Sequence, residues 1–223
     1  MKTLKLLGIP LLLSVFILCA SATDASKETE RIHNAANVLK DFAAMKESIP
    51  HKLLEKYSGI VIIPHMINAG FGIGGKRGKG VAMVKLDDGK WSDPVFVTLT
   101  GGSFGLQIGV QSVDLVLVFH HRGVLTKVKN GDFTIGGDIS AAAGPVGRSG
   151  TASTDYALRA EVYSYSRARG LFAGITINGA NLSIDKTADA NFYGDTLNSQ
   201  DIFMTSKSPS ESVRMLKETL ESL

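Results

Sequence analysis

Cysteine is almost absent from the sequence, which contains only Cys19. That residue lies in an N-terminal segment with the pattern of an export signal. Lys2 and Lys5 come first, an apolar run follows over 6–18, and Ala-Ser-Ala at 20–22 fits the small-residue cleavage pattern. The sequence therefore predicts an exported protein, periplasmic or secreted. Its mature part would contain no cysteine, which excludes a disulfide framework and thiol chemistry.

This interpretation gives a signal peptide over 1–22 and one domain over 23–223. The apolar run is shorter than the roughly 20 residues that a membrane-spanning helix needs. A second interpretation is a lipoprotein anchored through Cys19, which would hold the protein on a membrane. A lipidated cysteine usually follows a small residue, whereas Leu18 precedes Cys19, so simple cleavage is the favoured alternative.

The chain also lacks a strong excess of charge of either sign. Its formal net charge is +3, and loss of Lys2 and Lys5 with the leader would lower this to +1. A nearly neutral chain has no global electrostatic field for nucleic acid. We therefore expect no nucleic-acid partner, and any anion binding has to be local.

Patterns of catalytic and metal-binding residues are missing as well. None of the histidines forms the helical His-Glu-x-x-His pattern of zinc hydrolases. His120 and His121 are adjacent at a predicted strand end, so we expect them to point to opposite faces. Ser103 lies in Gly-x-Ser-x-Gly, but a strand follows where a nucleophile elbow needs a helix. The sequence thus predicts no enzyme, cofactor or metal, with a serine hydrolase at Ser103 as a remote alternative.

Glycine, in contrast, is dense: six glycines lie between positions 70 and 80, together with Lys76, Arg77 and Lys79. The residues here match two phosphate-binding sequence patterns, G-x-G-x-x-G and G-x-x-x-x-G-K. Both require a following helix, and an alternating strand follows instead. We interpret 70–80 as a glycine-rich loop whose cations and bare amides suit an anion such as a phosphate headgroup. The alternative is a twisted loop with solvated lysines.

Further cations fall in predicted turns. If these turns share one end of a sheet, their charges form a cationic rim, and each charge near an anionic bilayer contributes about 1 kcal/mol. The alternative is scattered, solvated charge. The predicted lipid-binding residues are Lys76, Arg77, Lys79, Arg148, Arg167 and Arg169.

The segment 26–48 has the spacing of an amphipathic helix, which the Ile49-Pro50 pair should end. Ile32, Leu39 and Phe42 lie on its apolar face. That face either packs on the protein core or contacts a membrane surface. Its polar face mixes acids with bases, which weakens the attraction to anionic lipid.

The remaining chain reads as strands in sequence joined by short turns, closed by a C-terminal helix that begins near Ser210. An Asp-Gly turn over 87–90 predicts a hairpin, and Gly101-Gly102 predicts a second turn. Short turns between strands favour antiparallel pairing, and the glycines permit strong curvature. We therefore predict an α+β fold: a curved, barrel-like antiparallel sheet flanked by N-terminal and C-terminal helices.

An ordered set of short motifs resembles one family. The motifs are Gly-Gly-x-x-Gly-Lys-Gly-Val (74–81), Trp-Ser-x-Pro-x-Phe (91–96), Ser-Phe-Gly-Leu-Gln-Ile-Gly (103–109), Gly-Pro-Val-Gly-Arg (144–148) and Tyr-Ser-x-Ser-Arg-Ala-Arg-Gly-Leu-Phe-Ala-Gly (163–174). A last motif, Asn-x-x-Tyr-Gly, is represented near 191–194 by Asn191-Phe192-Tyr193-Gly194. Together they resemble the SYLF domain, also described as a Ysc-type actin-binding domain. The resemblance covers about residue 30 to the C-terminus.

The resemblance implies a non-catalytic, lipid-binding module. Eukaryotic members bind phosphoinositides, some bind actin, and an N-terminal amphipathic segment is held responsible for membrane contact in some of them. That segment corresponds to the helix over 26–48. Because the chain carries an export signal, the resemblance implies an exported member of bacterial type that binds anionic phospholipid, not actin. An envelope structural or protein-binding module, using a sheet edge or the C-terminal helix, is the alternative.

Overall fold

The computed structural model describes residues 8–45, 49–126, 132–144, 160–168, 171–172, 177–195 and 197–223. Its helices are α1 (Gly8–Ala43), α2 (His51–Lys56), α3 (Gly123–Thr126), α5 (Lys186–Tyr193), α6 (Ser199–Phe203) and α7 (Glu211–Glu221). Its strands are β1 (Gly59–Val84), β2 (Val95–Phe119), β3 (Asp132–Ile135), β4 (Ala141–Ala143), β5 (Val162–Ala168), β6 (Leu171–Phe172) and β7 (Ala180–Ile184). The predicted turn over 144–148 lies outside these residues except for Gly144.

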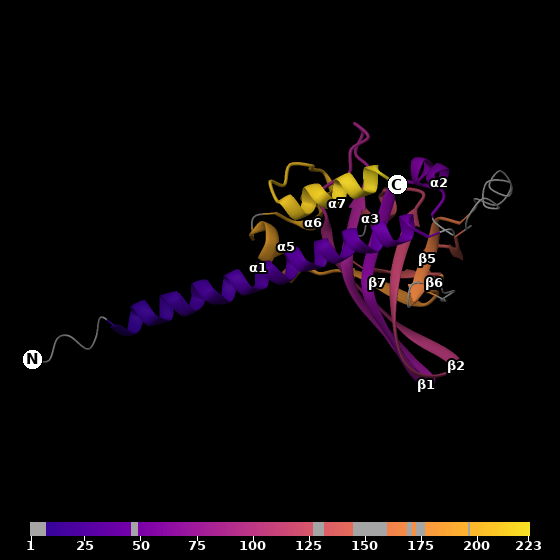
Figure 1. Cartoon of the computed structure of the whole chain (residues 1–223), viewed down its shortest axis with the longest axis horizontal. Helices are drawn as coiled ribbons and strands as arrows, with labels where there is room; N and C mark the ends of the chain where they lie inside the picture. Colours follow the sequence, from indigo (N-terminus) through magenta and orange to yellow (C-terminus); the bar gives the residue numbers. More distant parts are fainter. Residues whose placement is uncertain are drawn as a thin grey trace, which may run out of the picture.

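The strands form one curled sheet of seven strands, in the order β3-β7-β2-β5-β4, with β1 paired to β2 and β6 to β5. Helices from both ends of the chain flank it (Figure 1). The predicted α+β class with a curved sheet and terminal helices is confirmed. One detail differs, because β4 pairs with β5 in parallel. The two strands follow each other in the chain, but residues 144–161 separate them, so no short turn dictates their direction.

Most of the sheet is one long ribbon of two strands. β1 and β2 pair antiparallel from Ala82↔Val95 to Gly59↔Phe119, and the Asp-Gly turn joins them as predicted, with Gly89 at φ 82°. Near their midpoints the two strands bend sharply and return toward the body (Figure 1). The bend coincides with a register shift between Phe71 and Gly72.

Two predicted interruptions are therefore wrong. The glycine stretch 70–80 is not a loop, and Gly101-Gly102 is not a turn, because both lie inside the long strands. Their glycines pair with each other across the ribbon, as in Gly70↔Gly109 and Gly75↔Gly102. Hydrogen-bonded pairing over the whole ribbon satisfies the backbone that a loop would leave to water.

Close packing explains part of this glycine content. A Cβ at Gly80 would overlap the carbonyl oxygen of Ile62, and one at Gly78 would overlap the side chain of Ile63. The second half of β1 thus lies against the first half. Glycine density did indicate a close approach of backbone, but at these two positions the approaching group is the same strand and not a ligand.

β1 also contains an internal proline, Pro64. β1 continues through it by a register shift between Ile63 and Met66, which removes Pro64 and His65 from the ladder. His65 takes a left-handed conformation (φ 49°), and its amide donates to Asp114 Oδ1 at 2.9 Å. A bulge is one of the few places where an internal strand tolerates proline.

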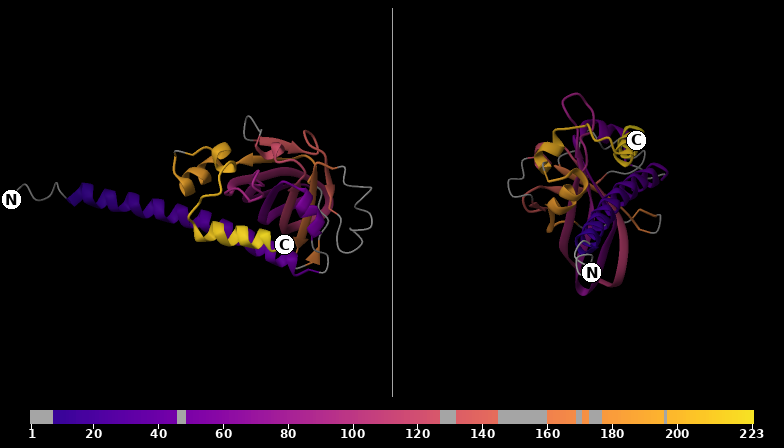
Figure 2. Two further views of the ribbon diagram at one scale, coloured as in Figure 1. Left: turned by 90° about the horizontal axis from the view of Figure 1, so that it is seen from above. Right: turned by 90° about the vertical axis from the view of Figure 1, so that its left-hand side faces the viewer.

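α1 and α7 lie side by side across one face of the sheet (Figure 2). α1 starts earlier and ends sooner than the predicted helix over 26–48. Its buried face joins the ribbon residues Ile60, Ile62, Val81 and Met83 in one apolar cluster. Alternate ribbon residues, such as Val61 and Ala82, face a second cluster on the other side. Within the part of the chain that the structure describes, no helix has the length and apolarity to cross a membrane.

Candidate functional site

The bend of the β1–β2 ribbon forms a projecting end (Figure 1). Three apolar side chains of this part of the ribbon are exposed. Ile73 is 73% exposed, Val110 is 74% exposed and Ile67 is 44% exposed. We call these three residues the ribbon tip. Arg77, which is also exposed, lies four residues beyond Ile73 along β1. Such exposure contrasts with the returning ends of the ribbon, where β1 and β2 are buried on both faces.

The charge at the ribbon tip has one sign. The sequence contains no Asp or Glu over 59–86 or 94–113, whereas Lys76, Arg77 and Lys79 are all in β1. The next carboxylate along β2 is Asp114, which is buried. An apolar end flanked by cations and free of carboxylates is the chemistry of a surface that meets anionic lipid.

The predicted cationic cluster is only partly assembled, because several of its members are bound inside the protein. Lys79 Nζ contacts Asp185 Oδ2 at 2.9 Å, and Arg31 of α1 contacts the same oxygen at 3.2 Å. Burial alone would raise the pKa of Asp185, but the Lys79 hydrogen bond and the two cations hold that pKa below its usual value. Lys79 therefore ties β1 to the start of α5.

Arg167 also serves the fold. Its guanidinium contacts Asp114 on β2 and Asp41 on α1, each at 2.6 Å. Burial alone would lower the pKa of Arg167, but the two carboxylates raise it. Asp114 in turn accepts the His65 amide at the bulge. One arginine thus links α1, β2 and β5.

The other predicted lipid-binding residues differ from one another in exposure. Lys76 is buried, and burial lowers the pKa of its ammonium group. Arg77 is exposed beside the ribbon tip. Arg148 and Arg169 lie outside the described residues. Among the predicted cations that the structure describes, Arg77 and Lys79 are exposed, and Lys79 is paired with Asp185.

The three predicted membrane-contact residues of α1 face inward. Ile32, Leu39 and Phe42 have no exposed surface and pack in the cluster that α1 shares with the ribbon and α7. This is the core-packing alternative for the amphipathic face. Membrane contact by these residues stays a prediction, and it would require α1 to leave the sheet.

Ser103 lies within β2 and pairs with Gly74. Its side chain is outside the described part of the structure. A nucleophile elbow needs a sharp strand-to-helix turn directly at the serine, and β2 instead continues to Phe119. The backbone at Ser103 does not have that geometry.

The prediction for the adjacent histidines is wrong. The rings of His120 and His121 lie 4.2 Å apart between centroids and do not point to opposite faces. The alternation of a strand applies only while the strand lasts, and β2 ends at Phe119, so His120 is already in a bend. His121 also lines a shallow cleft of about 730 Å³, together with Lys85 and Arg122.

Two buried carboxylates that sequence reasoning missed fix the C-terminal part of the chain. Asp93 accepts from Lys217 Nζ at 2.6 Å and from the amides of Lys207 and Ser208. Asp189 accepts from the Phe96 amide at 2.8 Å and from Ser199 Oγ at 2.7 Å. Burial raises the pKa of Asp189 to about 6.

Asp93 stands at the unspecified position of the Trp-Ser-x-Pro motif, so that motif marked its neighbours and not Asp93 itself. Its contacts place it in the packing of the C-terminal segment and not in a solvent-facing site. The same holds for Asp189, which is 2% exposed. Neither carboxylate is positioned to meet a soluble ligand.

Comparison with known proteins agrees with the architecture. The family profile described as "Ysc84: Las17-binding protein actin regulator" matches residues 100–223, which is more than half of the chain. The chain belongs to the Ysc84 family. The resemblance to the SYLF domain is thereby confirmed, and the match begins within β2 and runs through α7.

Several curated relatives in the Ysc84 family are similar over most of this chain. "SH3 domain-containing YSC84-like protein 1" of Xenopus laevis is 36% identical over 169 residues, covering 72% of this chain and 50% of the relative. The Homo sapiens protein of that name is 33% identical, covering 75% and 51%. "LAS seventeen-binding protein 3" of Saccharomyces cerevisiae (strain ATCC 204508 / S288c) is 32% identical, covering 84% and 43%. The chain thus spans about half the length of these relatives.

Proposed function

We propose that this Ysc84-family chain is a non-catalytic module that binds anionic phospholipid surfaces through the ribbon tip. The observation that supports the proposal is the exposure of Ile73 and Val110 at the end of a projecting ribbon. Exposed apolar groups gathered at one place are typical of interaction sites. The absence of carboxylates from both ribbon strands up to Asp114 favours an anionic lipid surface over a neutral one.

The expected binding is weak and has two parts. Full burial of an Ile or Val side chain contributes about 1.5–3 kcal/mol, and partial insertion into the headgroup region contributes less. One cation at an anionic surface adds about 1 kcal/mol. Arg77 supplies such a cation, whereas Lys79 and Arg167 are already paired within the protein. We therefore expect reversible binding that salt weakens only in part.

The test is co-sedimentation with vesicles that contain phosphatidylglycerol. We expect Ile73→Ser with Val110→Ser to abolish most of the binding. The matched control is Met204→Ser, because Met204 is 70% exposed but lies at the end of α6. Equal binding by the tip variant and the control variant would contradict the proposal.

The electrostatic part has its own test. Arg77→Ala should weaken binding to anionic vesicles about fivefold, which corresponds to about 1 kcal/mol, and should leave binding to phosphatidylcholine vesicles unchanged. Lys207→Ala is the control, since Lys207 is exposed near α7. If both variants lose the same affinity, the attraction is diffuse and does not reside at the tip.

A protein partner is the second candidate, and the family supports it. The matching profile carries the description of a Las17-binding actin regulator, and the matched region includes α7 and the strands β3 to β7. Co-sedimentation of the purified chain with actin filaments, in the absence of lipid, tests this candidate. Binding to filaments with no affinity for vesicles would favour the protein-binding module over the lipid-binding one.

We also propose that the chain is exported and acts in the periplasm or outside the cell. Lipidation of Cys19 would hold it on a membrane. The apolar run and the cleavage pattern near Ala22 support this proposal. Mass spectrometry of the protein purified from its native host tests it. A mature chain that starts at Thr23 supports export, and an N-terminus that retains Lys2 contradicts it.

A further inference from the structure

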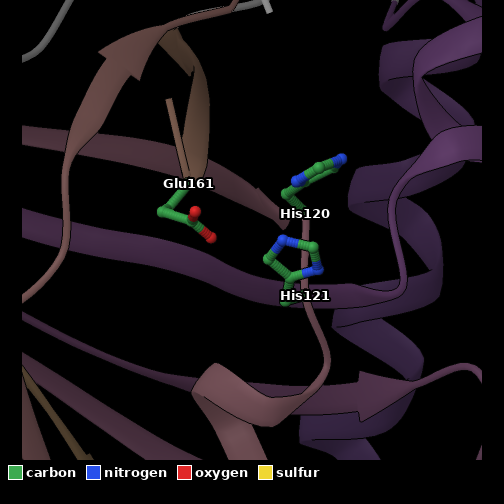
Figure 3. Close-up of side chains that lie close together, drawn as sticks. All are labelled: His120, His121 and Glu161. Carbon is green, nitrogen blue, oxygen red and sulfur yellow. The ribbon is translucent and has the colours of Figure 1, made fainter. Parts of the chain in front are cut away.

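We propose that His120, His121 and Glu161 form a binding site for a divalent first-row transition metal such as Zn²⁺. One ligand atom from each residue lies within 4.8 Å of the other two. Figure 3 shows the Glu161 carboxylate pointing toward the two imidazole rings. The site is independent of the proposed lipid binding, since the nine β2 residues 111–119 separate Val110 from His120.

The donor set is suited to a transition metal. Imidazole nitrogens favour Zn, Cu, Ni and Fe, whereas Mg²⁺ and Ca²⁺ require oxygen ligands. Bonds of about 2.0–2.2 Å to nitrogen and oxygen would place the donor atoms about 3–3.5 Å apart. Side-chain rotations of exposed histidines can close the remaining distance. With three protein ligands, the other coordination positions are left to water, as in open zinc sites.

The backbone around the three ligands is fixed before any ion binds. The His120 amide donates to the Glu161 carbonyl at 2.9 Å, which joins the end of β2 to the segment that enters β5. Ser58 Oγ donates to the His120 carbonyl at 2.9 Å and accepts from the Arg122 amide at 2.8 Å. These bonds hold the backbone of the histidine segment beside Glu161, so a metal would need to order only the side-chain torsions.

Two neighbours shape the site further. The Tyr57 ring lies 5.2 Å from the His120 ring and limits the rotation of that imidazole. His121 borders the cleft that Lys85 and Arg122 also line. Both of those cations are engaged, Lys85 with the Leu54 carbonyl at 2.8 Å and Arg122 with Asp87 at 2.7 Å.

The experiment is a calorimetric titration of the untagged protein with Zn²⁺, in a Cys19→Ser background so that no thiolate competes. We expect one ion to bind per chain with a dissociation constant in the micromolar range. His120→Ala with His121→Ala should weaken binding at least a hundredfold, and Glu161→Gln at least fivefold. The matched control is His33→Ala, because His33 is an exposed histidine on α1.

A second readout separates coordination from nonspecific binding. Co²⁺ bound by two imidazoles should give a visible absorption band, which the double histidine variant loses and His33→Ala keeps. Circular dichroism without metal should be the same for all variants, which shows that they fold. The proposal is overturned if Zn²⁺ binds no more tightly than millimolar, or if the double variant binds as tightly as the parent.

Discussion

The returning ends of the β1–β2 ribbon and its tip are built from the same glycine-rich strands but have opposite surroundings. At the returning ends, Ile62 and Val81 face the helices, Ile63 and Ala82 face the second cluster, and Gly80 touches the backbone of Ile62. At the tip, Ile73 and Val110 contact mostly solvent. Within one strand, glycine and apolar residues therefore pack in the protein core at the returning ends and form an exposed surface at the tip.

The same division applies to the cations. Arg167 and Lys79 are bound to carboxylates where the ribbon meets α1 and α5, whereas Arg77 extends into solvent near the tip. A cation in the body thus contributes to stability, and a cation at the tip is available to a partner. Charge substitutions should consequently affect unfolding in one region and binding in the other.

The largest expected effect is at Gly80. Gly80→Ala places a Cβ on the carbonyl oxygen of Ile62, which forces the two halves of β1 apart, and we expect a loss of about 3 kcal/mol or more in the free energy of unfolding. Gly75→Ala is the matched control, because its Cβ would lie 3.8 Å from the nearest heavy atom. Urea denaturation measures both variants. Equal stabilities would mean that the ribbon does not fold back as described.

Arg167→Ala should have the next largest effect. It leaves Asp114, which is 7% exposed, without its guanidinium partner, and breaking such a buried pair costs about 3 kcal/mol. Arg77→Ala should change the free energy of unfolding by less than about 0.5 kcal/mol. If urea denaturation shows a larger loss for Arg77→Ala than for Arg167→Ala, then Arg167 is not the arginine that stabilises the fold.

Asp189→Asn should change the pH dependence of stability. Burial raises the pKa of Asp189 to about 6, above the ordinary 3.8, so between those values the folded state retains a proton that the unfolded state releases. Stability from this group is therefore highest below about pH 4, and it falls by up to about 3 kcal/mol as the pH rises through 6. The Asp189→Asn variant has no carboxyl at this position, so it should not lose this stability as the pH rises.

The measurement is the free energy of unfolding of the parent and the Asp189→Asn variant at pH 4.5 and 7.5. We expect the variant to gain stability relative to the parent as the pH rises. Asp201→Asn serves as control, since Asp201 is exposed on α6. A parent-to-variant difference that is the same at both pH values would show that the Asp189 carboxyl is ionised throughout.

The smallest expected effect on stability belongs to the tip. Ile73→Ser and Val110→Ser remove side chains that have little buried surface, so each should change the free energy of unfolding by no more than about 0.5 kcal/mol. Urea denaturation of the same preparations that are used with vesicles checks this. A larger loss would mean that weaker vesicle binding reflects unfolding and not the loss of a contact.

Local signals in the sequence predicted the elements that local contacts determine. The Asp-Gly turn at 87–90 and the C-terminal helix that begins near Ser210 both formed as expected. Each depends on one backbone conformation or one helical period. α6 was missed, although Asn198 caps it by accepting from the Asp201 amide at 3.0 Å, because five residues carry no clear period.

Contacts distant in sequence could not be predicted in the same way. Nothing local in the glycine stretch reveals that Gly80 lies on Ile62, since that contact depends on the bend of the whole ribbon. The partners of Arg167 come from α1 and β2, far away along the chain. His120 and Glu161 likewise meet only through the pairing of β2 with β5. The exposure of the ribbon tip and the proximity of His120, His121 and Glu161 therefore became visible only in the structure.

The register of the ribbon has a consequence for the order of folding. Its pairs range from Ala82↔Val95, which are 13 residues apart, to Gly59↔Phe119, which are 60 residues apart. Each pair that forms shortens the loop that the next pair has to close, so the entropy cost of closure is met in small steps. We expect the Asp-Gly turn to nucleate the ribbon, which then zips outward until α2 is brought beside the strand that ends at Phe119. Strands β5 and β7, which pair with β2, would then add to an edge of β2 that has already formed.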